Sequence, residues 1–231
     1  MKIGIIGAGK IGGALALLFT KAGHDVDVAN SRGPDTLAAF AAKTGAHPVT
    51  VGEAVRDKDM VIVTIPLHAI PALPDNLFAD VPASTIIVDT NNYYPRERDG
   101  AVPAIESGMT ESNWVAQQLG RDVVKAFNMI YATSLEDLGK PAGDPNRIAI
   151  AVAGDDPQAK TVVIGLINEI GFDGVDAGSL EDSWRQQPGT PVYVKGYTAD
   201  GVKKALSQAS RERTEQWTAT ANSPGTFGAP A

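Results

Sequence analysis

Three glycines near the start of the chain, Gly7, Gly9 and Gly12, have the spacing of a turn that binds the pyrophosphate of a dinucleotide. They follow an apolar run, residues 2–6, and precede an amphipathic stretch, residues 11–20. In such a turn the first glycine permits the sharp bend, the second lets backbone N–H groups approach the phosphates, and the third lets the next helix pack closely. The N-terminus of that helix attracts the negative charge of the pyrophosphate. The predicted dinucleotide contacts are Gly7, Ala8, Gly9, Lys10 and Ile11.

The end of the second apolar run, residues 25–29, indicates which dinucleotide binds. The residues that follow it are Asn30, Ser31 and Arg32. An NAD site normally has a carboxylate about 20 residues beyond the glycine turn, where it binds the ribose hydroxyls and repels a 2′-phosphate. A guanidinium instead holds that phosphate by charge-assisted hydrogen bonds, and a hydroxyl adds another. The sequence therefore predicts NADPH as the cofactor, with Arg32 as its main specificity residue.

Two further strand ends are expected at the same site, because ligands of an open α/β sheet bind beyond the carboxyl ends of its strands. Thr64, Ile65 and Pro66 end one apolar run and are predicted to lie along the ribose and pyrophosphate. Asn91 and Asn92 end the next run and are predicted to reach the nicotinamide carboxamide. The alternative for these two residues is a plain asparagine turn.

His68 follows the strand end at residues 64–66, and its imidazole titrates near neutral pH. A histidine in the first turn of a helix is more often a neighbour of the cofactor, so we predict a binding role rather than a catalytic one. HExxH and GxSxG motifs do not occur in the sequence, so no metal site and no catalytic residue are predicted. An NADPH enzyme without a recognisable proton donor points to an acceptor that needs only hydride, such as a flavin or deazaflavin ring stacked on the nicotinamide.

The composition is that of a globular protein with one large or two small domains. Of the 231 residues 43% are hydrophobic and 20% charged, and the lack of cysteine excludes disulfides and thiolate chemistry. The net charge of −7 argues against nucleic acid as a partner. No apolar run approaches the length that crosses a bilayer, and Met1 leads directly into the first predicted strand. We therefore expect a soluble, cytoplasmic protein with no signal peptide and no membrane partner.

Strand and helix patterns alternate along the chain, which predicts an α/β fold with a doubly wound parallel sheet covered by helices on both faces. The predicted strands are residues 2–6, 25–29, 47–49, 60–65, 85–88, 122–126, 147–153 and 172–175. The predicted helices are residues 11–20, 34–43, 53–56, 111–119, 134–138 and 157–170. Residues 1–128 are expected to form a dinucleotide-binding Rossmann domain, and residues 129–231 a small C-terminal α/β lobe on the acceptor side. The unit 147–175 either extends the sheet or forms that lobe.

Three segments outside these elements carry predictions of their own. Residues 93–108 contain many turn formers and are expected to pass over the end of the sheet as an exposed excursion. Lys203, Lys204 and residues 211–213 form a basic stretch with interleaved acids, which is expected to be a solvated helix face. The chain is expected to fray from about residue 219.

With these motifs the chain resembles the NADPH-dependent coenzyme F420 reductases, also called F420-dependent NADP oxidoreductases. The segments that carry the resemblance are residues 3–13, 30–32, 64–66, 124–128, 152–156, 159–160 and 175–178. The resemblance implies a Rossmann domain with a small C-terminal lobe, usually in a homodimer, and hydride exchange between NADPH and a deazaflavin. It also implies that NADPH is surrounded by residues 8–11, Ser31, Arg32, residues 64–66 and His68. The acceptor contacts that it implies are Asn128, Met129, Ile130 and Ala132.

The acceptor side departs from the family pattern. Asn128 stands where the F420 reductases have a histidine, and Tyr131 places a large ring where they tend to have small residues. Residues 183–189 are similar to a subgroup of the family whose acceptor is unassigned. Two alternatives to a deazaflavin or flavin acceptor therefore stay open, namely an NADPH-dependent reductase of a small carbonyl or imine and a non-catalytic NADPH-binding regulator. The carbonyl reductases of this class use a large helical second domain, for which the residues after 128 are too few.

Overall fold

A parallel sheet of six strands forms the centre of the computed structural model, which describes residues 1–219. The strand order is β3-β2-β1-β4-β5-β6. The strands are β1 (Lys2–Ile6), β2 (Asp25–Ala29), β3 (His47–Pro48), β4 (Met60–Val63), β5 (Ile86–Asp89) and β6 (Val124–Lys125). The reversal of strand order between β1 and β4 defines a Rossmann fold and places the ligand crevice at the carboxyl ends of these two strands. The predicted fold class is confirmed.

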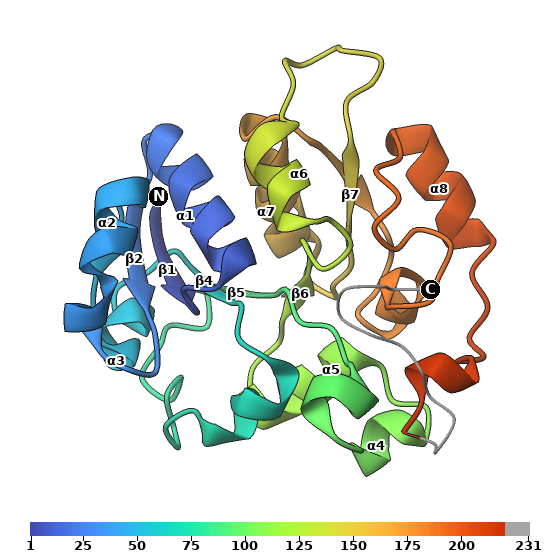
Figure 1. Ribbon diagram of the computed structural model, residues 1–231, viewed down its shortest axis with the longest axis horizontal. Coiled ribbons are helices and arrows are strands. Elements are labelled where there is room, and N and C mark those ends of the chain that lie inside the picture. Colours follow the sequence, from blue (N-terminus) through green and yellow to red (C-terminus); the bar gives the residue numbers. More distant parts are fainter. Residues whose placement is uncertain (220–231) are drawn as a thin grey trace.

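Helices cover both faces of the large sheet, as Figure 1 shows. One core includes residues of α1 (Lys10–Lys21), α2 (Ala38–Thr44), α6 (Ala132–Asp137) and α7 (Pro157–Glu169). The other includes residues of α3 (Val51–Val55), α4 (Pro103–Glu106) and α5 (Glu111–Leu119). Strand β4 is buried throughout, with Ile62 in the first core and Val63 in the second. This two-sided burial explains why the strands of the sequence are continuous apolar runs.

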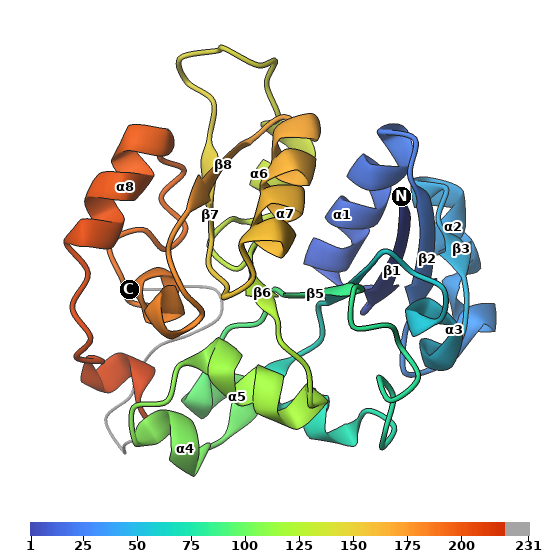
Figure 2. The ribbon, with the colours of Figure 1, turned by 180° about the vertical axis from the view of Figure 1, so that it is seen from behind.

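Two further strands form a sheet of their own. They are β7 (Ala149–Val152) and β8 (Asp173–Asp176), which pair in parallel with α7 as the crossover. An antiparallel bridge between Lys125 and Ala153 joins this sheet to β6, with N···O distances of 2.8 and 3.0 Å. Helix α8 (Ala199–Ser207) packs on β7 and β8 (Figure 2). The unit predicted at residues 147–175 thus forms a small separate sheet and does not extend the large one.

The segment after β5 differs from the exposed excursion predicted for residues 93–108. Tyr93 and Tyr94 are buried, and a π-helical turn (Pro95–Asp99) follows them. The prediction is wrong for this first part because the Tyr93 hydroxyl donates to Glu106 at 2.8 Å and its ring packs in the core shared with α5. Turn-forming residue types alone do not reveal such tertiary burial.

The basic stretch near the C-terminus is divided between two environments. Lys203 and Lys204 are exposed on α8, as predicted. Residues 211–213 are not helical, and Arg213 donates to the buried Glu111 at 3.1 Å, so the helix-face prediction is wrong there. A buried carboxylate requires a cation or hydrogen-bond donors, and Arg213 supplies them.

Two other predictions concern the chain as a whole. The predicted fraying falls on residues 220–231, which lie outside the described part of the chain. Within residues 1–219 no helix has both the length and the apolar character needed to span a membrane.

Candidate cofactor and acceptor site

The glycine turn between β1 and α1 leaves room for an anion. Gly7 has φ +121°, and a Cβ there would lie 2.3 Å from the Thr64 carbonyl oxygen. A Cβ on Gly12 would lie 1.9 Å from the Gly7 oxygen, so both positions require glycine. A Cβ on Gly9 would meet nothing within 4 Å, so the space beside this residue is open. Gly9 caps α1 without a side-chain hydrogen bond, which leaves the first N–H groups of the helix for a phosphate.

The loop after β2 presents its cation to solvent. Ser31 and Arg32 are exposed. Asn30 accepts a hydrogen bond from the Arg32 N–H at 2.9 Å and donates one to the Thr36 hydroxyl at 2.9 Å. The Asn30 amide thus fixes the loop and positions Ser31 and Arg32.

A cavity of about 570 Å³ extends from the glycine turn to the loop after β6. The predicted residues that line it are Gly9, Lys10, Ile11, Thr64, Ile65, Pro66, Asn91, Asn92, Asn128, Ile130 and Ala132. The other residues that line it are Thr90, Tyr94, Arg98, Phe127, Tyr131, Thr133, Tyr193 and Val194. A volume of several hundred Å³ is typical of sites that enclose small molecules. The structure therefore brings cofactor and acceptor residues from separate strand ends to one cavity.

Some of the predicted residues do not line this cavity. They are Gly7, Ala8, Asn30, Ser31, Arg32, His68 and Met129. His68 is half-exposed at the start of a 3₁₀ helix (Leu67–Ala72), with its Nδ1 3.0 Å from Asp99 Oδ1. Met129 is buried in the core of β7 and α8, where its sulfur accepts a hydrogen bond from the Ala151 N–H.

Amide side chains join the small lobe to the end of β5. Asn92 donates to the Asn128 carbonyl oxygen at 2.8 Å, and Asn128 donates to Asn92 Oδ1 at 3.0 Å. The fully buried Gln186 donates to Asn128 Oδ1 at 2.9 Å, and its carbonyl oxygen accepts from Asn128 at 2.7 Å. Residues 183–189, which the sequence left without a role, therefore hold Asn128 in place. Both amide hydrogens of Asn128 are used within the protein, so we expect this residue to shape the acceptor side.

Charged side chains are buried beneath Asn91. Asp89 and Lys125 are fully buried at the ends of β5 and β6, with the ammonium 3.3 Å from Asp89 Oδ2. Lys125 also donates to the Asn91 carbonyl oxygen, and the Ser112 hydroxyl donates to Asp89 at 2.6 Å. Glu111 lies 3.9 Å from the ammonium. Buried charges are tolerated when they are paired and hydrogen-bonded. Because Lys125 also binds the Asn91 carbonyl oxygen, the cluster holds the segment that carries Asn91 in place.

Glu111 links the same cluster to the C-terminal segment. Arg213 donates to its Oε1 at 3.1 Å, and the guanidinium lies 5.0 Å from the centroid of the Tyr93 ring. Burial raises the pKa of Glu111 above its usual value, while the charges of Arg213 and Lys125 act in the opposite direction. The C-terminal segment therefore contributes to the charge balance beneath the site.

Two tyrosines that line the cavity come from different parts of the chain. Tyr94 follows β5 and Tyr193 precedes α8, and their hydroxyls form a hydrogen bond with each other. Trp217 packs against both rings at centroid distances of 6.0 and 6.4 Å. A Cβ on Gly189, where φ is +86°, would lie 2.4 Å from the Trp217 ring, so this packing requires glycine. The rings are thus held by the C-terminal segment.

An ion pair positions a cation beside Tyr94. Arg98 donates to both oxygens of Asp99 at 2.9 Å, and its guanidinium lies 4.9 Å from the Tyr94 ring centroid. The Tyr94 N–H donates to Asp99 at 2.8 Å. Burial by itself would raise the pKa of Asp99, but the hydrogen bonds from Arg98 and the Tyr94 N–H outweigh it and hold the pKa below its usual value. The anionic Asp99 therefore orients Arg98.

Sequence reasoning missed Tyr94, Arg98 and Tyr193 as cavity residues. Tyr94 lies two positions beyond Asn92, so the rule that ligands bind at strand ends could have included it. Tyr193 has no such signal, because it lies 99 residues from the hydroxyl that it contacts.

Comparison with known proteins agrees with this fold. A family model described as NADP oxidoreductase, coenzyme F420-dependent, matches residues 2–93. The F420-dependent NADP reductase of Methanocaldococcus jannaschii is 30% identical over 216 residues, which cover 84% of this chain and 91% of that protein. The solved structure of the Sinorhizobium meliloti protein SMa0349 has a TM-score of 0.71 at 30% identity and covers 86% of this chain and 95% of that chain.

Two other relatives match over a smaller share of their own length. The Escherichia coli (strain K12) protein YjhV is 45% identical over 71 residues, which are 31% of this chain and 52% of that protein. Metalloreductase STEAP3 of Rattus norvegicus is 30% identical over 182 residues, which are 78% of this chain and 34% of that protein. The chain thus spans about half of the first relative and about a third of the second.

The Rossmann sheet and the glycine turn are those of a dinucleotide-binding fold, and the family model that matches residues 2–93 is that of NADP oxidoreductases. Since the match to the Methanocaldococcus jannaschii reductase covers most of both proteins, the chain belongs to the F420-dependent NADP oxidoreductase family.

Proposed function

We propose that this protein transfers hydride between NADPH and a flat heteroaromatic acceptor, either a deazaflavin such as coenzyme F420 or a flavin. The observation that carries the proposal is the cavity that joins Gly9 and Lys10 to Ile130 and Ala132. Hydride transfer between two rings requires proximity and orientation, which one enclosure for both rings supplies. The Methanocaldococcus jannaschii relative is an F420-dependent NADP reductase, which supports this acceptor class.

The residues around the glycine turn fit NADPH. Helix α1 offers N–H groups without a side-chain cap, and the open space beside Gly9 admits a pyrophosphate. Ser31 and Arg32, exposed at the tip of β2, suit the 2′-phosphate. Thr64 lines the cavity between these points. When bound, NADPH supplies the hydride from its nicotinamide ring.

The acceptor side of the cavity suits a flat ring. Ile130 and Ala132 provide apolar surface, and Tyr131 between them in the sequence is 48% exposed. Such surfaces exclude water and stack on aromatic rings. In this proposal residues 1–128 hold the cofactor, and the residues after 128 complete the acceptor side.

Rapid-mixing measurements of NADPH oxidation test the proposal. The panel of acceptors contains coenzyme F420, FMN, FAD, small aldehydes and cyclic imines. We expect coenzyme F420 to be reduced fastest, with one reduced deazaflavin formed for each NADPH consumed. Tight NADPH binding without oxidation by any acceptor would instead favour a non-catalytic NADPH-binding regulator.

Reduction of a small carbonyl or imine is the second candidate. The observation compatible with it is the hydrogen-bonded pair of Tyr94 and Tyr193, which line the cavity, because a carbonyl oxygen or imine nitrogen, like a deazaflavin or flavin ring, takes up a proton as well as a hydride. Faster turnover of an aldehyde or imine than of coenzyme F420 in the same panel would replace the first candidate by this one.

The proposal extends to the assembly and location of the protein. We infer a cytoplasmic homodimer from the resemblance to F420-dependent NADP oxidoreductases. The net charge of −7 supports the absence of a nucleic-acid partner. Sedimentation velocity tests the dimer, for which we expect twice the chain mass of 24.1 kDa at micromolar concentration.

A further inference from the structure

The tyrosine pair at the cavity forms a connected chain of hydroxyl groups. Tyr94 and Tyr193 are both buried and both line the cavity, and their hydroxyls are hydrogen-bonded. The Asn92 amide nitrogen lies 3.5 Å from the Tyr193 hydroxyl, and Asn92 is bonded to Asn128 at the start of the acceptor loop. A proton held on this pair is therefore next to the residues predicted to face the acceptor.

The surroundings distinguish Tyr94 as the residue whose anion is better stabilised. Burial raises the pKa of Tyr94 to about 12, while the hydrogen bond from Tyr193 and the charge of Arg98 lower it. The carboxylates of Glu111 and Asp99 act to raise it. At neutral pH the hydroxyl thus keeps its proton. A phenolate formed there is stabilised by Arg98, 4.9 Å from the ring centroid, and by the Tyr193 hydroxyl.

Tyr193 has a different environment. Burial raises the pKa of its hydroxyl strongly, and the neighbouring Tyr94, Glu111 and Tyr131 raise it further. Tyr193 therefore suits the second position of the chain, where it passes a proton on and does not hold the negative charge.

We propose that Tyr94 is the catalytic acid of the hydride-transfer reaction, that Tyr193 restores its proton, and that the acceptor belongs to the class that takes up both a hydride and a proton. This inference rests on the proposed function. Deazaflavins, flavins, carbonyls and imines all belong to this class. The sequence pointed to an acceptor that needs only hydride because no proton donor was recognisable in it, and the tyrosine pair supplies that donor.

The step balances as follows. A C–H bond of the reduced nicotinamide breaks, and its hydride forms a C–H bond on a deazaflavin, carbonyl or imine, or an N–H bond on a flavin. The acceptor gains two electrons and a negative charge on another conjugated nitrogen or on oxygen. Tyr94 donates its hydroxyl proton to that atom, so its O–H bond breaks and an N–H or O–H bond forms. Tyr193 then donates its proton to the Tyr94 phenolate while it takes a proton from solvent, so that no negative charge stays on Tyr193. In sum, NADPH, the acceptor and one proton give NADP and the reduced acceptor.

A purely structural role for the two hydroxyls is the rival explanation, because Trp217 packs against both rings. Phenylalanine keeps the ring and removes the hydroxyl, so it retains this packing. A structural hydroxyl affects stability, whereas a proton donor affects the pH dependence of turnover.

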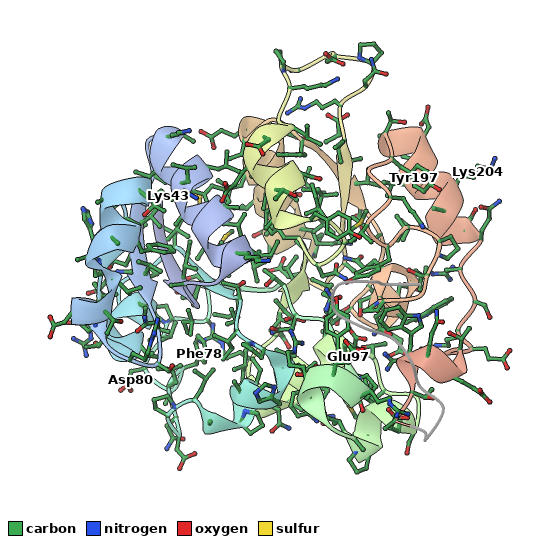
Figure 3. The ribbon with its side chains drawn as sticks, in the orientation of Figure 1. Lys43, Phe78, Asp80, Glu97, Tyr197 and Lys204 are labelled. Carbon is green, nitrogen blue, oxygen red and sulfur yellow. The ribbon has the colours of Figure 1, made fainter. Side chains whose placement is uncertain are left out.

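The experiment compares four tyrosine-to-phenylalanine variants of the full chain, with NADPH and coenzyme F420 as substrates. Tyr94→Phe and Tyr193→Phe test the pair. Tyr93→Phe is the buried control, since the Tyr93 hydroxyl donates to Glu106. Tyr197→Phe is the surface control, because Tyr197 is 40% exposed beside α8 (Figure 3). Thermal unfolding and the Kd for NADPH report folding and cofactor binding in each variant.

We expect Tyr94→Phe to lower kcat by about 100-fold or more, the range of a lost general acid, with the Kd for NADPH unchanged. Tyr193→Phe should have a smaller effect, about 10-fold, because water can also reprotonate Tyr94. The remaining rate of Tyr94→Phe should fall as pH rises and should increase with imidazolium buffer, since a small acid replaces the donor. The turnover rates of the wild-type protein and of the two control variants should not increase with imidazolium buffer.

Failure of the donor assignment and failure of the proposed function give different results. If Tyr94→Phe turns over as fast as Tyr93→Phe, or if buffer does not restore its rate, the assignment of the donor is overturned while hydride transfer stands. If the unchanged chain oxidises NADPH with none of the deazaflavin, flavin, carbonyl and imine acceptors, the proposed function is overturned and the donor with it.

Discussion

The cofactor side and the acceptor side of the cavity are built in different ways. On the cofactor side the backbone of Gly7, Gly9 and Gly12 and the N-terminus of α1 shape the site within one short stretch of chain. On the acceptor side Asn128 is held by a residue 58 positions away, and Tyr94 by one 99 positions away. We therefore expect cofactor binding to depend on residues close to the glycine turn and to the end of β2, and acceptor specificity to depend on contacts between distant side chains.

This difference predicts how the two sides respond to substitution. A backbone-built site changes mainly when a glycine is lost. A site built from side-chain networks loses several partners at once when one member is removed, because the others remain buried without hydrogen bonds. Five substitutions test this contrast.

The largest effect is expected from Lys125→Met, which removes the cation between the acceptor-side networks. Asp89 then lies buried without its ammonium partner, and the Asn91 carbonyl oxygen loses a donor. Removal of one partner from a buried ion pair costs about 3–5 kcal/mol. Urea unfolding should show a loss of this size in the free energy of unfolding.

Lys204→Met is the matched control, because Lys204 is exposed on α8 (Figure 3). Its free energy of unfolding should stay within about 0.5 kcal/mol of the unchanged protein. An equally small change for Lys125→Met would show that the buried cluster contributes little to stability, and the contrast between the two sides would fail.

The next largest effect is expected from Gly12→Ala on the cofactor side. Its Cβ would lie 1.9 Å from a backbone oxygen, and the overpacking should cost about 3 kcal/mol of stability. Gly9→Ala is its counterpart, since a Cβ there meets nothing within 4 Å. We expect Gly9→Ala to fold normally and to bind NADPH more weakly in calorimetry, because the methyl group occupies space for the pyrophosphate. Unchanged NADPH affinity in Gly9→Ala would place the phosphates elsewhere.

Arg32→Ala tests the cofactor choice on the same side. Loss of a charge-assisted contact to the 2′-phosphate should weaken the binding of NADPH by about 2 kcal/mol, or roughly 30-fold in Kd. The affinity for NADH, which lacks this phosphate, should hardly change. Titration calorimetry with both dinucleotides measures this. Equal losses for NADPH and NADH would remove the role proposed for the guanidinium.

The cofactor side could be predicted from the sequence because its determinants are local. The strands β1 and β2 begin and end where the sequence predicts, at residues 2–6 and 25–29. The need for glycine at positions 7 and 12 follows from their spacing and the strand before them. Each of these inferences uses residues within one turn or one element.

The acceptor side could be predicted only in part. The sequence placed Asn128 at a strand end, but nothing in it shows that Gln186 binds the Asn128 amide or that Arg213 reaches Glu111, 102 residues away. Met129 illustrates the same limit, because its position in the acceptor loop suggested a contact while its side chain packs in the core of the small lobe. Such pairings are set by how the two sheets join, and local patterns do not encode that.

The smallest effect is expected from Asp99→Asn, which weakens the ion pair that orients Arg98 beside Tyr94. Hydrogen bonds to a charged group contribute about 1–2 kcal/mol more than hydrogen bonds to a neutral group. Because the asparagine side-chain oxygen still accepts some of these bonds, the free energy of unfolding at neutral pH should fall by only about 1 kcal/mol. Asp80→Asn, on an exposed loop residue (Figure 3), should change stability by less.

The pH dependence of that cost identifies its origin. The pKa of Asp99 is lower in the folded protein than its usual value, so the folded state binds this proton less tightly than the unfolded chain does. The stabilisation is complete above the unfolded pKa of about 3.9 and is lost as pH falls through the folded pKa. Urea unfolding at neutral pH and near pH 3 should therefore show the difference between Asp99→Asn and the unchanged protein shrinking in acid. A difference that stays constant would mean that Asp99 acts by packing, and then Arg98 would not depend on its charge to stay beside Tyr94.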